Sequence, residues 1–348
     1  MIRICTSLCN AGYSVTLVGV NHKGSSPPLM ARPFRQKRIN TYCRKGPGFY
    51  AEYNCRLFFY LLFTRADLFC CIDLDTILPV WLASVLRGKK RVYDAHEYFS
   101  QQKEIVTRPH IYKVWHRIEQ KMVPLFPNGY TVGQQIATAF LQLYQVKYAI
   151  IRNMPWLKDN VPSTHDRKRD IIYQGAINEA RGIEYLVPAM HQVDARLLLY
   201  GDGNYMEQTK KLIESNNLGE KVFLKGKLLP VDLESATAQA YIGVNLVENV
   251  GLNQYFSLAN KFFDYIHHLV PQVTMDFPEY RTINKQYEVA VLIHHPERVT
   301  IAACLNQLLQ DEQLYLRLQN NCFKARAELN WQREEKILIA FYHHLFTS

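Results

Sequence analysis

The sequence lacks the features that would mark a membrane-spanning, secreted or repeat protein. Its longest apolar run, residues 57–63, falls far short of the roughly 20 residues that cross a bilayer. Near the N-terminus, Arg3 is followed by a mixed segment where a signal peptide would have an apolar core. No internal repeat of solenoid length is apparent. These absences favour a globular protein that acts in the cytoplasm.

Metal-ligand and disulfide patterns are also lacking. The eight cysteines (5, 9, 43, 55, 70, 71, 304 and 322) show no CxxC spacing, and two of them are adjacent in an apolar segment. The paired histidines at 267–268 and 294–295 are neighbours whose side chains face different directions. We therefore expect buried, reduced thiols and neither a disulfide framework nor a metal site.

What is present is a chain long enough for two domains. It has 348 residues, 48% of them hydrophobic, and a net charge of +10. The excess charge is local. One basic patch carries no acid and contains Arg32, Arg35, Lys37, Arg38, Arg44 and Lys45, and a second cluster lies at residues 87–91. Such a patch can contact nucleic acid, a phosphorylated substrate or an anionic membrane, or it can be a solvated loop or helix face. Nucleic acid is the least favoured, because no recognised binding module is present.

Short apolar runs alternate with longer amphipathic ones along the chain, which predicts parallel sheets covered by helices on both faces. The predicted strands are residues 13–20, 68–73, 91–95, 128–132, 148–152, 170–174, 195–200, 221–224, 241–246 and 289–293. The predicted helices include residues 112–123, 182–191, 205–216 and 300–309.

The domain boundary is predicted at residues 153–169, which are polar and contain two prolines. The fold class is therefore α/β, with two doubly wound, Rossmann-like domains at 1–152 and 170–330 that face each other across a cleft. A doubly wound domain normally opens with a strand and a glycine-rich turn. Here a helical pattern opens the chain, so we expect that the first strand is missing or lies upstream.

The most informative stretch is residues 257–265, which follows an apolar run and a polar loop. A strand, a loop and a helix opened by Ser257 and Asn260 form the layout of an anion-binding corner. Lys261 could face a phosphate, and Asp264 could accept hydrogen bonds from sugar hydroxyls. The alternative is that the aromatics between them are core and that both charges are solvated.

Three other features of the C-terminal half are candidates for contact with a ligand. Gly175 ends one predicted strand, and Arg181 stands at the entrance of the next helix, where it could bind a diphosphate. It could equally pair with Glu179 or Glu184. Gly201, Asp202 and Gly203 end another strand and are either a ligand-binding loop or an ordinary tight turn.

In the N-terminal half, Asp94, His96 and Glu97 follow a predicted strand, at the edge where open α/β sheets bind ligands. His96 titrates near neutral pH and could orient or deprotonate a hydroxyl. The alternative is a histidine that only hydrogen-bonds its own loop.

The order and spacing of these pieces resemble the retaining "group 1" glycosyltransferases of the GT-B fold, over nearly the whole chain. The resemblance implies that Arg181 and Lys261 hold the donor diphosphate, that Asp264 holds the donor ribose, and that His96 lies near the reacting sugar. Residues 331–348 resemble the family's helix that crosses back onto the first domain. Three positions depart from the family pattern: Asp264 is one methylene shorter than the expected Glu, Phe256 stands where the first acid of Glu-x7-Glu is expected, and Ala176 replaces a basic residue. Glu248 could supply the missing carboxylate.

The resemblance thus implies a glycosyltransferase that uses a nucleotide-sugar donor and retains the anomeric configuration, with no cofactor and no metal. We expect an envelope polysaccharide or lipid-linked acceptor, because the basic patch and the aromatic residues 49–63 could rest on an anionic inner leaflet. A nucleotide-sugar epimerase and a non-catalytic scaffold are the alternatives.

Overall fold

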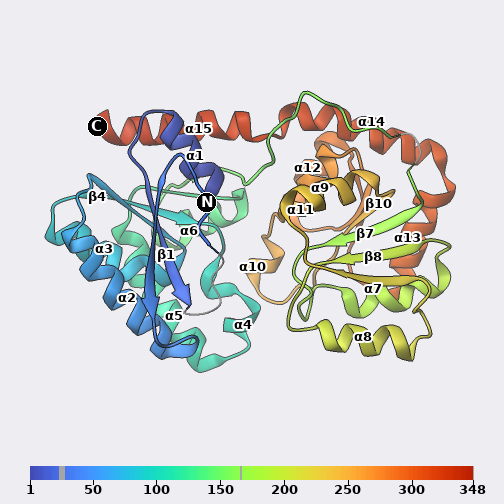
Figure 1. Cartoon of the computed structure of the whole chain (residues 1–348), viewed down its shortest axis with the longest axis horizontal. Coiled ribbons are helices and arrows are strands. Elements are labelled where there is room, and N and C mark those ends of the chain that lie inside the picture. Colours follow the sequence, from blue (N-terminus) through green and yellow to red (C-terminus); the bar gives the residue numbers. More distant parts are fainter. Residues whose placement is uncertain (23–27, 165–166, 348) are drawn as a thin grey trace. The chain divides into compact units, whose positions relative to one another are not determined.

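The computed structural model describes residues 1–22, 28–164 and 167–347. Contacts divide the chain into unit 1, Met1–Arg152 with Glu334–Ser348, and unit 2, Asn153–Arg333. Positions 165–166 of the predicted linker and Ser348 of the predicted last helix lie outside the described residues. Figure 1 shows that each unit layers helices on parallel strands.

Unit 1 begins with a helix and then alternates strands with helices. Its elements are α1 (Ile2–Asn10), β1 (Thr16–His22), β2 (Arg35–Thr41), α2 (Gly46–Phe63), β3 (Leu68–Ile72), α3 (Ile77–Leu86), β4 (Lys90–Ala95), α4 (Lys103–Val106), α5 (Pro109–Met122), β5 (Gly129–Thr131), α6 (Gln134–Tyr144) and β6 (Ala149–Ile150). All its strand pairs are parallel, and from β2 onward helices carry the chain back between successive strands.

The strands of unit 1 form two sheets, with the orders β1-β2 and β3-β4-β5-β6. Among the described residues, β1 pairs with β2 alone and β3 with β4 alone. In the doubly wound order 3-2-1-4-5-6, the first strand lies between the second and the fourth. Unit 1 thus has two separate parallel sheets in the described residues, where that order has one.

The basic patch is not a helix face, and only part of it is a loop: Arg32, Arg44 and Lys45 lie in irregular segments, whereas the other three cations belong to a strand. Residues 35–41 form β2, in which Ile39 and Thr41 are buried while Arg35 and Lys37 are exposed. These four side chains are two residues apart and therefore share one face of the strand, which is exposed at the start of β2 and buried at its end. The charges at the start of the strand interrupt its apolar run.

Unit 2 is a doubly wound domain with a six-stranded parallel sheet of order β12-β11-β10-β7-β8-β9. Its elements are β7 (Asp170–Gln174), α7 (Ile183–Ala189), β8 (Arg196–Tyr200), α8 (Met206–Ser215), β9 (Val222–Gly226), α9 (Pro230–Gln239), β10 (Ile242–Asn245), α10 (Leu252–Tyr255), α11 (Asn260–His267), β11 (Gln272–Met275), α12 (Pro278–Tyr287), β12 (Ala290–Ile293), α13 (Arg298–Gln310) and α14 (Glu312–Glu328). The predicted strands omitted β11, because its buried Gln272 and Thr274 interrupt the apolar run.

The last helix, α15 (Trp331–Thr347), contributes to both units. At its start, Trp331 donates its backbone N–H to Pro155 O in unit 2. Further along, Glu334 accepts a hydrogen bond from the Arg152 backbone, and Tyr342 is buried against Tyr130 in unit 1.

The cysteines are free thiols, but they are not all buried. Cys43 and Cys55 are exposed, which corrects the expectation of uniformly buried thiols. Cys43 follows β2 in a surface segment, and Cys55 lies on the outer face of α2. Within the described ranges, none of the helices combines the length and the apolar character that a membrane crossing needs.

Candidate functional site

The carboxyl ends of β7 and β8 and the start of α11 bring the predicted cations and glycines of unit 2 together. Lys261 lies in the first turn of α11, and its Nζ is 3.9 Å from the centroid of the Tyr173 ring. A Cβ placed on Gly175 would lie 3.4 Å from that Nζ. The ammonium is therefore held between an aromatic face and a bare stretch of backbone, where a cation–π contact stabilises it.

The surroundings of Lys261 weaken its proton affinity. The pKa of Lys261 is lowered to about 7, first by burial and then by charge repulsion from Arg181, while Asp264 opposes the shift. Arg181 therefore stands close enough to Lys261 for the two cations to repel each other. Two cations that repel each other are an arrangement that a bound anion would stabilise.

Asp264 is held in place by a chain of side chains. Gln174 Nε2 donates to Asp264 Oδ2 at 2.8 Å, and Thr237 Oγ1 donates to Gln174 Oε1 at 2.7 Å. Gln174 is the last residue of β7, so the carboxylate is fixed at the same strand end as Gly175. The sequence indicated Asp264 but neither supporting side chain, because β7 and α9 meet only in the folded unit.

The glycines are required by the close approach of two loops. A Cβ on Gly201 would lie 1.8 Å from Gly175 O, and one on Gly203 would lie 2.3 Å from Ile177 O. The backbone is further joined by the Gly175 N–H, which donates to Tyr200 O at 3.0 Å. Gly201 and Gly203 thus allow the loops after β7 and β8 to interlock. Asp202 between them is exposed and accepts from the Gly203 N–H at 2.8 Å.

The loop that carries Arg181 is fixed from two sides. The Ala180 N–H donates to Glu184 Oε1 at 2.9 Å, and Ala180 O accepts from the Glu248 N–H at 3.0 Å. The Glu248 carboxylate interacts with Tyr185 and raises the pKa of that phenol. Glu248 therefore lies beside the start of α7 and helps to shape the Arg181 loop.

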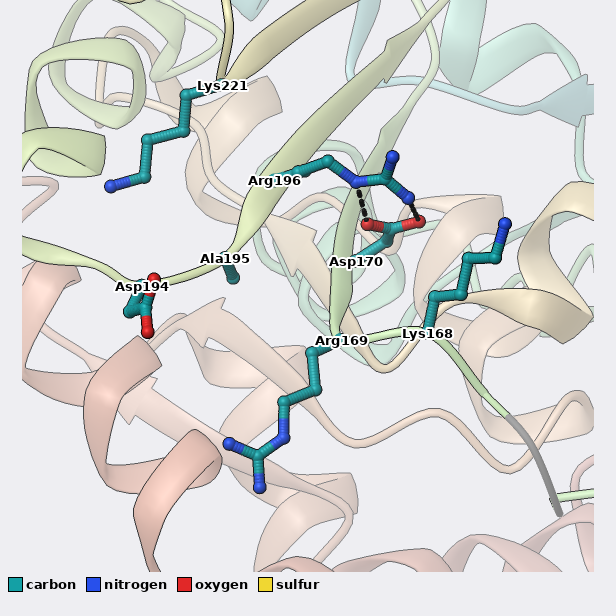
Figure 2. Close-up of a pocket in the computed structure, with 7 residues that line it drawn as sticks. All are labelled: Lys168, Arg169, Asp170, Asp194, Ala195, Arg196 and Lys221. Atoms are coloured by element: carbon teal, nitrogen blue, oxygen red, sulfur yellow. Dashed lines mark hydrogen bonds and ion pairs between the residues drawn. The ribbon is translucent and has the colours of Figure 1, made fainter.

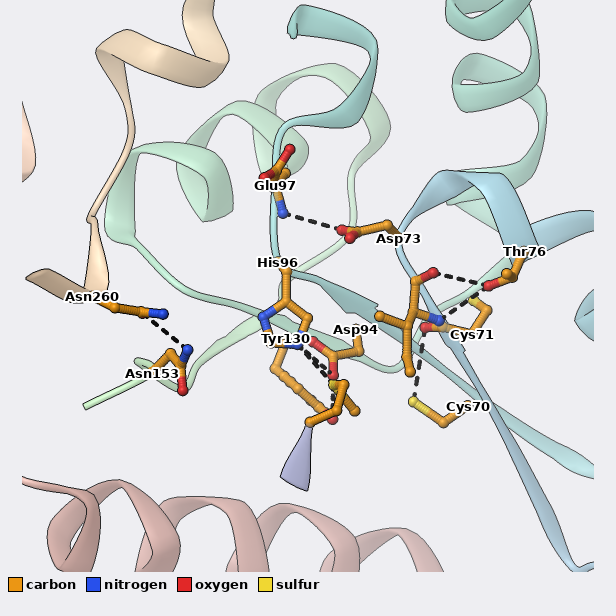
Figure 3. Close-up of polar contacts among 12 residues, drawn as sticks. Cys70, Cys71, Asp73, Thr76, Asp94, His96, Glu97, Tyr130, Asn153 and Asn260 are labelled. Atoms are coloured by element: carbon orange, nitrogen blue, oxygen red, sulfur yellow. Dashed lines mark hydrogen bonds and ion pairs between the residues drawn. The ribbon is translucent and has the colours of Figure 1, made fainter. Parts of the chain in front are cut away.

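Ser257 and Asn260 take positions at the edge of this group. The Ser257 hydroxyl lies 3.4 Å from Tyr280 OH, which also accepts from the Ala259 N–H at 3.0 Å. Asn260 is exposed, and its Oδ1 accepts from Asn153 Nδ2 at 2.9 Å (Figure 3). Both residues hold the entrance of α11 in place.

In unit 1, Asp94 and His96 form a buried polar pair at the end of β4. His96 Nε2 lies 3.2 Å from Asp94 Oδ2, and Tyr130 donates its hydroxyl to the same oxygen at 3.0 Å (Figure 3). Burial lowers the pKa of His96, but Asp94 and then Asp73 raise it by more, so the net pKa is raised. The other oxygen, Asp94 Oδ1, is buried without a hydrogen-bond partner among the described residues.

The second carboxylate near His96 is Asp73 and not Glu97. Glu97 donates its backbone N–H to Asp73 Oδ1 at 3.1 Å (Figure 3), while its own carboxylate accepts from Gln102. Burial raises the pKa of Asp73 to about 7. Asp73 lies directly after β3, and Asp94 lies near the end of β4. The position of Asp73 at the carboxyl end of a strand is a sequence signal that could have identified it.

A cavity of about 450 Å³ lies elsewhere in unit 2, at the amino ends of β7, β8 and β9 (Figure 2). Its charged lining contains Asp170 and Arg196, which already form two hydrogen bonds of 2.7 Å with each other. Lys168, Arg169 and Lys221 point in different directions in Figure 2. The cavity is on the opposite edge of the sheet from Lys261 and does not belong to that site.

Among the described residues, no three His, Cys, Asp or Glu side chains gather where they could hold a metal ion. The charged groups at the carboxyl edge of unit 2 are instead suited to an anionic ligand that also carries hydroxyl groups. The cations are Lys261 and Arg181, and the hydrogen-bond acceptor is Asp264.

Residues 157–325 match the family model "Glycosyl transferases group 1". No curated protein sequence matches the chain. Similar solved structures include sucrose-phosphate synthase from Thermosynechococcus elongatus, with a TM-score of 0.83 and 16% identity over 99% of this chain and 92% of that one.

Two further structures are similar in fold. Anabaena HepE in complex with UDP-glucose has a TM-score of 0.75 and 12% identity over 94% of this chain and 99% of that one. WaaG, a glycosyltransferase involved in lipopolysaccharide biosynthesis, has a TM-score of 0.75 and 13% identity over 97% of this chain and 93% of that one.

Proposed function

Because this chain belongs to the group 1 glycosyltransferases through residues 157–325 and has the GT-B fold, we propose that it transfers a sugar from a nucleotide diphosphate to an acceptor hydroxyl with retention of configuration. The observation that carries the proposal is the Lys261 ammonium, held over Tyr173 and Gly175 near Arg181. A sugar linked to UDP is the preferred donor, since UDP-glucose occupies the structure of similar fold from Anabaena.

The chemistry assigns a role to each charged group of unit 2. When the bond between the sugar and the diphosphate breaks, negative charge grows on the departing phosphate. Lys261 and Arg181 would stabilise that charge, and a fixed cation in a site of low dielectric does so with little reorganisation. Asp264, oriented by Gln174, would accept hydrogen bonds from the donor ribose.

On the acceptor side, His96 and Asp94 of unit 1 are proposed to orient the hydroxyl that attacks the sugar. The acceptor class is an envelope polysaccharide or a lipid-linked intermediate, and the protein would work as a peripheral protein on an anionic leaflet. The support is the surface of unit 1, where cationic β2 lies beside the aromatic-rich helix α2.

Lys261→Met tests the donor site, because it removes the charge and keeps most of the side-chain volume. We expect donor hydrolysis and transfer to fall together by roughly 10²–10³-fold, the usual loss when one charge-stabilising contact is deleted. Calorimetry with UDP and GDP measures binding in parallel. Lys210→Met is the control, because Lys210 is exposed on α8 and pairs only with a neighbouring acid, Glu207, at 2.6 Å.

The pH dependence of UDP binding provides a second signature of the same site. The pKa of Lys261 is about 7 in the free protein, and a bound diphosphate would raise it. Binding then takes up a proton above pH 7, so affinity should decrease by up to about tenfold per pH unit as pH rises from 7 to 8.5. Lys261→Met should lose this dependence.

Three results would contradict the proposal. A protein that binds neither UDP nor GDP would be the non-catalytic scaffold. Release of an altered nucleotide sugar without any acceptor would indicate the epimerase. Unchanged donor turnover in Lys261→Met would remove the assigned mechanism, even if the protein remained a glycosyltransferase.

A further inference from the structure

The outer face of helices α2 and α3 in unit 1 is unusually apolar. Helix α3 contains no charged residue, and the side chains that it exposes are Leu78, Leu82, Val85 and Leu86. On α2, Phe59 and Phe63 are exposed, and Phe63 is 81% exposed. We call these six side chains the apolar ridge. Large apolar patches on a protein surface usually mark a contact with a partner or a membrane.

Two hydrogen bonds join α2 to the segments that flank α3 and hold the two helices next to each other. Asn54 on α2 donates to Asp75 O just before α3, at 3.0 Å. At the other end, Arg87 after α3 donates to Leu61 O near the end of α2, at 2.9 Å. The helices therefore run parallel and side by side, as Figure 1 shows for α2 and α3. Phe63 and Leu86, the last residues of the two helices, lie at the same end of the pair.

Exposed cations border the apolar ridge. They are Arg32, Arg35, Lys37 and Arg65, which lie at or close to the starts of β2 and β3, and we call them the cationic border. Between residues 28 and 63 there are seven cationic side chains and one acid, Glu52. Glu52 accepts from the Tyr42 N–H at 2.9 Å, and this bond fixes the end of β2 against α2. The strand that carries Arg35 and Lys37 is thereby held beside α2.

The arrangement of a parallel βαβ unit brings the apolar ridge and the cationic border to the same edge of the sheet. A crossover helix runs opposite to the strands, so its last residue and the start of the next strand share an edge of the sheet. Arg35 begins β2, Arg65 precedes β3, and Lys89 precedes β4. These residues therefore lie at the edge where Phe63, Val85 and Leu86 end their helices.

We propose that the apolar ridge and the cationic border together form the surface by which the protein adsorbs to an anionic lipid leaflet. Phe63, Leu82 and Leu86 enter the boundary between headgroups and acyl chains, while Arg35, Lys37 and Arg65 contact lipid phosphates. Interfacial helices bind in this way, with apolar side chains below and basic ones at headgroup level. The inference deepens the membrane association included in the proposed function, and it replaces the predicted contact of residues 49–63 alone with the helix pair.

Charge complementarity favours a membrane over a second copy of the chain. If two copies paired through their ridges, their cationic borders would be brought together and would repel each other. An anionic leaflet meets the same cations with the opposite charge. Long Arg and Lys side chains can also extend from the edge of an apolar surface to reach phosphates.

The test is co-sedimentation of the full chain with vesicles of phosphatidylglycerol and phosphatidylcholine, at equal amounts and low salt, against vesicles of phosphatidylcholine alone. We expect binding to the anionic vesicles that weakens with added salt. The double substitution Val85→Glu with Leu86→Glu should reduce binding by about tenfold or more, because it places acids on the apolar ridge. Charge reversal in the cationic border, by Arg35→Glu with Lys37→Glu, should also reduce vesicle binding by about tenfold or more.

Val299→Glu is the matched control, because Val299 is an exposed apolar residue of α13 in unit 2, 67% exposed against 51% for Val85. It should bind vesicles as the unaltered chain does. Thermal melts of each variant establish that it is folded. UDP calorimetry on the same samples separates this inference from the proposed function, since the donor site does not involve the ridge.

The inference is overturned if the unaltered chain stays in solution with anionic vesicles, or if the ridge variant binds as well as the control. A dimer that dissociates in the ridge variant, without vesicle binding, would assign the ridge to a second copy of the chain. Light scattering distinguishes that result.

Discussion

Asp73 combines two features that cost stability. Its backbone has φ 54° and ψ 175°, a conformation that is almost restricted to glycine. Its carboxyl group is largely removed from water near Asp94, His96 and Glu97, and burial raises its pKa to about 7. Such strain is most often found at functional sites, where the surrounding structure holds a side chain in a required position. Asp73 therefore belongs with Asp94 and His96 in the polar cluster of unit 1.

Asp73→Asn should stabilise the protein in a pH-dependent way. The pKa of Asp73 is raised from 3.8 to about 7 in the folded protein, so the folded state binds more protons between these values. The contribution of Asp73 to stability is complete below pH 4 and is lost as pH rises to 7. The amide cannot ionise, so we expect the free energy of unfolding to increase by roughly 1–3 kcal/mol at pH 8 and little near pH 4.

Urea denaturation at the two pH values measures this difference. Asp67→Asn serves as the control in the same unit, because Asp67 is exposed and its ion pair with Lys89, at 3.3 Å, is a surface pair worth little. An equal effect of Asp73→Asn on the free energy of unfolding at pH 4 and pH 8 would mean that ionisation of Asp73 is not the reason why this residue destabilises the protein.

At the scale of elements, the loops that follow β7 and β8 are packed as one unit. Gly201 has φ 148°, and its Cα faces Gly175 O so closely that a Cβ would lie 1.8 Å away. The Gly201 N–H also donates to Gly226 O at 2.9 Å, so the loop after β9 joins the other two. Because Gly175 lies beside Lys261, so that a Cβ on Gly175 would be 3.4 Å from Lys261 Nζ, a displacement of these loops would change the surroundings of this cation.

Gly201→Ala should therefore lower the free energy of unfolding by roughly 2–4 kcal/mol, since the backbone of two strand ends must move apart. It should also weaken UDP binding, through the displacement of Gly175 from Lys261. Gly219→Ala is the control, because a Cβ on Gly219 meets nothing within 4 Å. Chemical denaturation and calorimetry of both variants measure the two effects, and equal stability of the two variants would contradict the interlocked-loop explanation.

The whole molecule consists of two α/β units that share the helix α15. Tyr342 on this helix is buried in unit 1, where its ring packs 6.3 Å from the ring of Tyr130. The Tyr130 hydroxyl in turn donates a hydrogen bond to Asp94. Helix α15 therefore packs against a residue that orients the polar cluster of Asp94 and His96. A segment distant in sequence thus completes the core of the first unit.

Tyr342→Ala should destabilise unit 1 by roughly 3–5 kcal/mol, the usual cost of deleting a buried aromatic ring. We expect UDP binding to persist, because the proposed donor residues all lie in unit 2. His343→Ala, at an exposed neighbouring position, should leave both properties unchanged. Calorimetric unfolding with and without UDP tests this, and loss of UDP binding in Tyr342→Ala would show that the donor site depends on unit 1.

The sequence alone determined the α/β class and most strands, because alternating apolar runs and turn residues are local features. β7 is an example: its run of Ile171, Ile172 and Tyr173 is continuous and ends at a glycine. The same local signal failed for β2 and β11, where charged or polar side chains interrupt the run and only pairing with neighbouring strands defines the element. Arg181, Lys261 and Asp264 were identified from their order along the chain.

Only the tertiary structure decided which groups meet. The approach of Lys261 to Tyr173, the bond from Gln174 to Asp264 and the gathering of Asp73 with Asp94 and His96 each join residues from different elements. The apolar ridge also became visible only when burial separated the inner and outer faces of α2 and α3. Hydrophobic patterning selects elements locally, whereas burial, pKa and hydrogen bonding depend on which surfaces the packed elements bring into contact.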